Sequence, residues 1–282
     1  HLGVAPRRWR AGGDEAGLTA GRAAPVALLL LLVVAVPWLA PFDPLDQDLS
    51  ALNVPPGTAH WLGTDHLGRD VFSRLLSGAG VTLAVALGGA ALALAAGAGL
   101  GVLASAAGRW TEATAFAALD TLRGLPPILL ALVTIAALGG GTAPLVLALG
   151  ASYAPMFAHV ARVAWRREAA AEYVPAAVAA GATPARVLWR HILPNLAGPL
   201  VTLFAIVVPR CVVTESALSF LGLGAAPDAP TWGRMAADAT RMAEAAPHAL
   251  LAPIAAITVA TAAAALAGDR LRRSADPLRA AR

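Results

Sequence analysis

Long runs without a charged side chain constrain this chain more than any other feature. The stretches free of Asp, Glu and Arg cover residues 23–42, 75–108, 124–161, 191–209, 216–227 and 245–268. An α-helix of about 20 apolar residues crosses the hydrocarbon core of a bilayer. Charged residues make up only 13% of the chain, whereas a soluble domain uses about 25% to cover its surface. We therefore expect an all-α membrane protein.

Six transmembrane helices fit these runs, near residues 24–41, 80–104, 114–138, 143–161, 197–222 and 248–268. The run 124–161 is too long for one crossing, and three consecutive glycines at 139–141 interrupt it. In the second helix, Gly97 and Gly101 have the spacing that lets two helices approach closely. We expect their partner to be another helix of the same chain, with a subunit contact as the alternative.

These helices divide the chain into five parts. They are a cytoplasmic N-terminal tail (1–23), the first helix (24–41), an outer interfacial segment (42–79), a five-helix core (80–268) and a cytoplasmic C-terminal tail (269–282). We expect the first helix to remain as a membrane anchor and not to be cleaved as a signal peptide. Its apolar run is followed by a Pro-rich segment and lacks a small-x-small cleavage site.

Arginine sets the expected orientation, since all 21 basic residues are Arg. Six crossings place 15 of them on the side of the two termini and 4 on the other side. Positive side chains stay in the cytoplasm, so both termini are predicted to be cytoplasmic. This clustering between apolar runs is typical of membrane topology, and we expect no nucleic-acid partner despite the net charge of +4.

The absence of Lys excludes a P-loop ATPase site and Schiff-base chemistry in this chain. Any ATP hydrolysis would occur on another chain, and no enzyme activity, cofactor or metal is expected here. An intramembrane serine protease fits poorly, because Ser152 and His159 share one predicted helix. An ATP-independent carrier is an alternative class of protein, but such a carrier would not need the long cytoplasmic loop that is predicted here.

The outer segment contains two acid-first pairs at i,i+4, Asp65 with Arg69 and Asp70 with Arg74. This spacing predicts an interfacial helix that leads into the second crossing. His60 and His66 lie nearby, but two His without further ligands do not make a metal site.

The predicted cytoplasmic loop, residues 164–195, is rich in helix formers. Pro175 can begin a short helix and Gly181 can end it. Thr183 can then cap a second helix, which Pro194 is expected to stop. The spacing leaves two roles open, which are docking into a groove of a partner protein and capping of helix ends within the chain.

Charged residues also fall within predicted crossings, where they are costly. Asp120 and Arg123 are three residues apart and can pair with each other or reach toward the interface. Arg210 lies near the middle of the fifth helix, five residues before Glu215. Two interpretations of Arg210 stay open. It either forms a buried interhelical pair or meets a carboxylate on a central pathway, in the substrate or near Glu215.

Four groups of segments, in the same order, resemble the permeases of ABC importers in the dipeptide/oligopeptide/nickel family, and within it the C-component type. They are GTDHLGRDVFSR at 63–74, AAVAAG at 176–181 with RHILPN at 190–195, LSFLGLG at 218–224 with WG at 232–233, and GDRLR at 268–272 with DP at 276–277. The resemblance covers nearly the whole chain.

This resemblance implies a type I ABC-importer permease in a bacterial inner membrane, surrounded by lipid. It would carry a peptide, glutathione, a nickel complex or a related small solute. The implied partners are a homologous second permease, two ABC ATPase subunits that bind the ATP, and an extracytoplasmic substrate-binding protein. That protein would dock near the outer loop 224–248, although a solvated turn explains the charges of this loop equally well.

The family's cytoplasmic loop couples the permease to its ATPase. The residues that the resemblance assigns to this coupling are Ala176, Ala177, Gly181, Arg186, Leu188, Arg190 and Pro194. The family usually has Glu at the position of Pro175. A charged contact to the ATPase would therefore have to come from Glu172 or Glu168.

Overall fold

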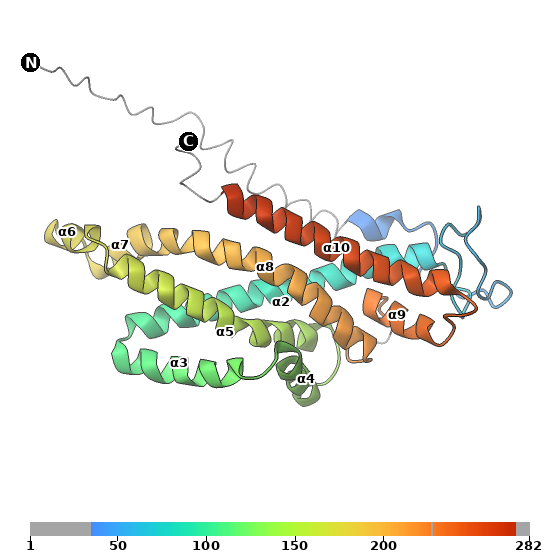
Figure 1. Cartoon of the computed structure of the whole chain (residues 1–282), viewed down its shortest axis with the longest axis horizontal. Helices are drawn as coiled ribbons and strands as arrows, with labels where there is room; N and C mark the ends of the chain where they lie inside the picture. Colours follow the sequence, from blue (N-terminus) through green and yellow to red (C-terminus); the bar gives the residue numbers. More distant parts are fainter. Residues whose placement is uncertain (1–34, 227, 275–282) are drawn as a thin grey trace, which may run out of the picture.

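The computed structural model describes residues 35–226 and 228–274, and within these ranges the regular elements are all helical (Figure 1). They are η1 (Val36–Leu39), α2 (Val71–Ala106), α3 (Arg109–Arg123), α4 (Pro127–Leu138), α5 (Thr142–Ala169), α6 (Tyr173–Ala179), α7 (Pro184–Val187), the π-helical segment η2 (Leu188–Ile192), α8 (Leu193–Phe220), α9 (Trp232–Thr240) and α10 (Pro247–Ser274).

Four long helices, α2, α5, α8 and α10, run along the length of the molecule (Figure 1). Each is long and apolar enough to cross a membrane, and α3 with α4 makes a fifth crossing if the bent pair counts as one. The predicted first helix, 24–41, lies mainly outside the described residues. Four to five of the six predicted crossings are therefore found in the described part of the chain.

Small residues bring α2 and α5 into close contact. A Cβ added to Gly97 would meet the carbonyl oxygen of Ala154, and one added to Gly101 would meet that of Ala158. The close approach expected for these two glycines is therefore made within the chain. Tight packing of this kind holds helices together where lipid removes the hydrophobic driving force.

The predicted third helix, 114–138, is wrong as a single element. The chain instead forms α3 and α4, which meet at an angle of 95°. Pro126 and Pro127 stand at this break, and Pro126 has an extended backbone. Proline lacks an N–H and disfavours helical geometry in the residue before it, so α3 ends before the pair and α4 begins with it.

The second helix also differs from the prediction, because α2 begins at Val71 and not near residue 80. Asp70 is its N-cap, and the Asp70 carboxylate accepts a hydrogen bond from the backbone N–H of Ser73 at 2.7 Å. Residues 71–79, predicted to belong to the outer segment, are thus the first turns of the long helix. Residues 40–70 form an irregular loop that ends at the cap, so the separate interfacial helix predicted here is wrong.

The two ends of the molecule carry different elements. One end holds α9 and the loop 40–70, and we call it the α9 end (Figure 1). The other end holds α6 and α7, and we call it the α6 end. The loop 164–195, predicted to be cytoplasmic, thus lies at the α6 end, and the loop 40–70, predicted to be outside, lies at the α9 end.

Candidate functional site

The loop at the α6 end is built by local backbone rules. Gly181 follows α6 with φ +86°, a conformation that only glycine adopts readily. The N–H of Gly181 donates to Val178 at 2.9 Å, and the N–H of Ala182 donates to Ala177 at 3.0 Å. Thr183 Oγ1 then accepts from the Arg186 N–H at 3.3 Å and caps α7. The end of α6 at Gly181 and the cap at Thr183 are as predicted.

The predicted stop at Pro194 is wrong. The chain passes from α7 through η2 into α8 as one helical stretch, Ala185–Phe220. In η2 the N–H of Leu193 donates to the carbonyl oxygen of Leu188, five residues back. Pro194 lies two residues after η2, inside this helical stretch, where its ring and its missing N–H would disturb a regular α-helical turn. The wider π-helical turn of η2 accommodates the proline within the continuous helix.

The side chains of this loop divide into an inner and an outer set. Val187, Ile192 and Leu196 are buried, and Ala177 and Leu188 pack against them. The outer set lies on the surface and consists of Ala176, Val178, Gly181, Arg186, Trp189, Arg190 and Pro194. Trp189 has 71% of its surface exposed, so the loop presents an apolar face that the described part of the chain does not cover.

Glu168 joins the loop to both long helices beside it. Its Oε2 accepts hydrogen bonds from Tyr173 Oη at 2.8 Å and from Asn195 Nδ2 at 3.0 Å. Burial, with the hydrogen bond to Glu168, raises the pKa of Tyr173. Glu168 is thus engaged inside the chain, whereas Glu172 is exposed.

A cavity of about 650 Å³ opens between α5 and α8 next to this junction. Its lining includes His159, Val163 and Arg167 from α5 and Asn195, Gly198 and Pro199 from α8. The cavity therefore lies where the loop meets the two long helices, with both polar and apolar walls.

Arg210 and Glu215 do not meet. Arg210 is exposed on α8 and has no ion pair among the described residues. Glu215 is fully buried, and its carboxylate accepts a hydrogen bond from Ser219 Oγ at 2.6 Å. Five residues along a helix correspond to a turn of about 140°, so the two side chains leave α8 in different directions.

Asp120 and Arg123 form the expected pair, with 3.9 Å between Asp120 Oδ1 and Arg123 Nη1. A second partner was not predicted, because His159 Nε2 lies 3.0 Å from the same Asp120 oxygen. Glu112, which the sequence did not single out, pairs with Arg162 and Arg166 of α5. No local spacing signals these contacts, since 39 to 54 residues separate the partners.

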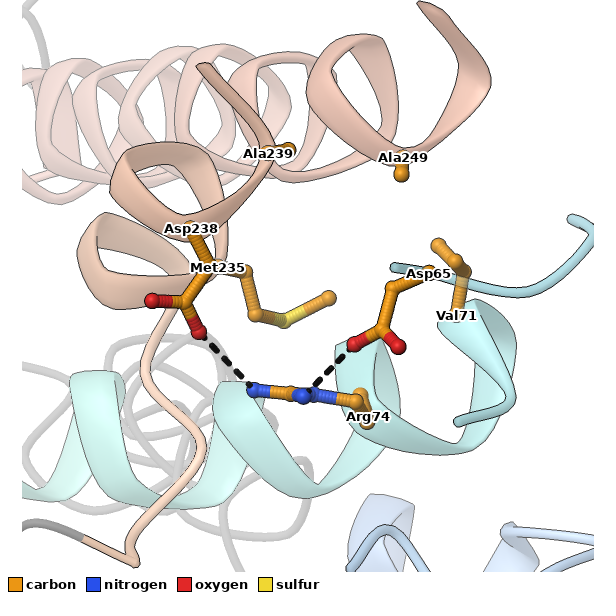
Figure 2. A pocket seen from close by; sticks show the side chains of 7 residues that line it. All are labelled: Asp65, Val71, Arg74, Met235, Asp238, Ala239 and Ala249. Atoms are coloured by element: carbon orange, nitrogen blue, oxygen red, sulfur yellow. Dashed lines mark hydrogen bonds and ion pairs between the residues drawn. The ribbon is translucent and has the colours of Figure 1, made fainter. Parts of the chain in front are cut away.

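At the α9 end, Asp65 forms ion pairs with Arg69 and Arg74, and Figure 2 shows the pair with Arg74. Its Oδ2 lies 2.8 Å from Arg69 Nε and 2.7 Å from Arg74 Nη1, and Asp238 of α9 lies 3.7 Å from Arg74 Nη2. The predicted pair Asp70–Arg74 is wrong, because the cap position turns Asp70 back over its own helix. The cavity here measures about 10 Å³, room for about one water molecule.

His60 has a structural partner, since its Nδ1 lies 2.9 Å from Asp70 Oδ1. Within the described residues, no group of three or more His, Cys, Asp or Glu side chains is placed to hold a metal ion. Ser152 and His159 are likewise occupied, because Ser152 Oγ donates to Ala148 O at 2.7 Å and His159 faces Asp120.

The anchorage of α9 brings together residues far apart in the chain. The backbone N–H of Trp232 donates to Thr82 Oγ1 at 3.3 Å, and its indole N–H donates to the carbonyl oxygen of Leu75 at 2.9 Å. A Cβ on Gly233 would collide with the backbone of Ser216. Helix α9 is therefore packed firmly against α2 and α8.

Known proteins resemble this chain over most of its length. The family described as "Binding-protein-dependent transport system inner membrane component" matches residues 94–280. The glutathione transport system permease protein GsiD of Shigella dysenteriae is 37% identical over 257 residues, which are 90% of this chain and 85% of that protein. GsiD of Pectobacterium atrosepticum is 36% identical over 258 residues, which are 90% and 86% of the two chains.

A solved structure shares the fold. It is an inward-facing conformation of the MetNI methionine ABC transporter, which matches with a TM-score of 0.60 at 21% identity. The match covers 72% of this chain and 96% of that chain. At this identity the likeness concerns the fold alone.

Proposed function

This chain belongs to the family of binding-protein-dependent transport system inner membrane components, and from that premise we propose that it forms one half of the solute pathway of an ABC importer for a peptide-like solute. It is a permease subunit of such an importer. The observation that carries the proposal is the continuity of the chain at the α6 end. There, a structured loop with an exposed apolar face leads directly into the two helices that border the 650 Å³ cavity.

The loop is the proposed contact with the ATPase. Its outer set offers Ala176, Val178 and Trp189 to a groove of the partner, and Arg186 and Arg190 flank this surface. Ala177 and Leu188 serve the coupling indirectly, because they pack against the buried residues of the loop. Since Glu168 is engaged within the chain, Glu172 is the better placed carboxylate for a charged contact in place of the family's Glu.

The same geometry suggests how movement of the loop reaches the pathway. Glu168 binds the loop at Tyr173 and the start of α8 at Asn195, so α5, the loop and α8 form one connected unit. In the proposed cycle, ATP binding closes two ATPase subunits and moves the loop. The displacement rocks α5 and α8 from an inward-facing to an outward-facing arrangement, and hydrolysis resets them.

The remaining partners are a homologous second permease, which supplies the other half of the pathway, and an extracytoplasmic substrate-binding protein, which docks at the α9 end. The relatives named as glutathione permeases favour a peptide-like solute such as glutathione over a nickel complex. Family membership and the apolar helices are consistent with a multi-pass inner-membrane protein.

Gentle solubilisation of native membranes, followed by capture through a C-terminal tag, tests this proposal. We expect an ATPase and a second permease to co-purify in stoichiometric amounts. Recovery of the chain alone, under conditions that keep a known importer intact, would contradict it and favour an ATP-independent carrier.

A further inference from the structure

Arg210 is a charged residue near the middle of the long apolar helix α8. It is the 18th of the 28 residues of α8, and by the helical rise it lies about 15 Å from the nearer end. That distance is too long for the side chain to reach the water beyond the helix end with ease. A charge in this position facing lipid is costly, so the face that carries it is expected to border protein or water.

The open face of α8 follows helical spacing. Thr202, Ile206, Arg210 and Val213 recur every three or four residues and are exposed or half-buried. Towards the α6 end the same spacing continues through Asn195 and Pro199, and both of these residues line the 650 Å³ cavity. One stripe of α8 thus leads from that cavity to Arg210.

No acid among the described residues neutralises Arg210. Glu215, the nearest acid along the helix, is fully buried and hydrogen-bonded to Ser219. On the facing helix α5, the Tyr153 hydroxyl is hydrogen-bonded to Thr214 at 2.9 Å and offers no carboxylate. The guanidinium is therefore an exposed cation whose counter-ion comes from outside the described residues.

We infer that Arg210 binds a carboxylate of the transported solute midway along the pathway. The guanidinium fork matches a carboxylate through two parallel N–H···O bonds, and it stays charged in an apolar setting. This inference rests on the proposed function and narrows the solute to one with a free carboxylate. An acidic side chain of the second permease is the other source of the same chemistry.

The test uses the full complex of permeases, ATPases and binding protein, reconstituted in liposomes. The two probes are glutathione and the analogue in which both of its carboxylates are carboxamides. We expect Arg210→Gln to lower kcat/KM for glutathione about 10- to 100-fold, the range for loss of a charge-assisted hydrogen bond. Uptake of the amide analogue should stay unchanged, and Arg210→Lys should restore part of the glutathione uptake. Arg270→Gln, which removes the charge of an exposed arginine on α10, is the control.

Four results would overturn the inference. Equal losses for glutathione and its amide analogue would indicate a structural role for Arg210. No loss for either probe would place Arg210 away from the pathway. Loss of the second permease from the Arg210→Gln complex would assign the carboxylate to that subunit. A wild-type complex that assembles and hydrolyses ATP but takes up neither probe would contradict the proposed solute itself, and Arg210 would then lose its proposed ligand.

Discussion

The carboxylate of Glu168 accepts a hydrogen bond from Asn195, 27 residues further along the chain, at 3.0 Å. The same oxygen accepts from Tyr173, so the loop between α5 and α8 is held at its start and at its end. We expect a loop fastened in this way to transmit a displacement to α5 and α8. Four predictions follow from this and from related contacts, in addition to the capture and uptake experiments above.

Replacing Glu168 should uncouple ATP hydrolysis from transport. Glu168→Ala removes both hydrogen bonds, each worth about 1.5–3 kcal/mol when the acceptor is charged. We expect the complex to assemble and hydrolyse ATP while its solute uptake falls, as measured in parallel in liposomes. Glu168→Gln keeps an acceptor oxygen and should give an intermediate uptake. Normal uptake per ATP in the alanine variant would contradict the coupling role.

Gly181 should tolerate Asn but not Val. Its φ of +86° is strained for side chains, although a Cβ there meets no atom within 4 Å. The left-handed conformation costs about 1–2 kcal/mol for ordinary residues, and Asn adopts it with less strain. We expect Gly181→Val to weaken co-purification of the ATPase and Gly181→Asn to preserve it. Equal recovery with both variants would show that the turn is not needed for docking.

Gly101→Val should destabilise the protein, whereas Gly99→Val should not. At Gly101 a Cβ would collide with Ala158, and at Gly99 it meets open space. Overpacking of this kind costs about 1–3 kcal/mol or more. Thermal unfolding of the detergent-solubilised protein measures the difference. A similar Tm for the two variants would contradict the close approach of α2 and α5.

Asp65→Asn should be far more damaging than Asp70→Asn. Asp65 is the close partner of the buried Arg74 side chain, and removing one member of a buried pair costs about 3–5 kcal/mol. Asp238, at 3.7 Å, offsets part of this loss. Asn caps a helix about as well as Asp, so Asp70→Asn should lose little beyond its contact with His60. Tm values in the reverse order would restore the pairing of Arg74 with Asp70.

Local sequence patterns predicted several of the helices and their ends. Charge-free runs predicted the positions of α5, α8 and α10, because lipid requires each apolar segment to satisfy its own backbone hydrogen bonds. Gly181 and Thr183 also behave as expected, since a helix end depends on residues within one turn of it. The break between α3 and α4 was equally local, and Pro126–Pro127 carried the signal that the charge count overlooked.

The partners of individual side chains could not be predicted in the same way, because they depend on distances that no local spacing encodes. Arg74 lies four residues after Asp70 but pairs with Asp65, nine residues away, since the cap geometry turns Asp70 aside. Trp232 reaches Thr82 across 150 residues, and Glu168 reaches Asn195 across a whole loop. The sequence could name Arg210 as a charge in an apolar helix. Only the tertiary structure shows that the face of α8 with Arg210 is open and that Glu215 points away from it. This arrangement follows from the way α2, α5, α9 and α10 cover the rest of the helix.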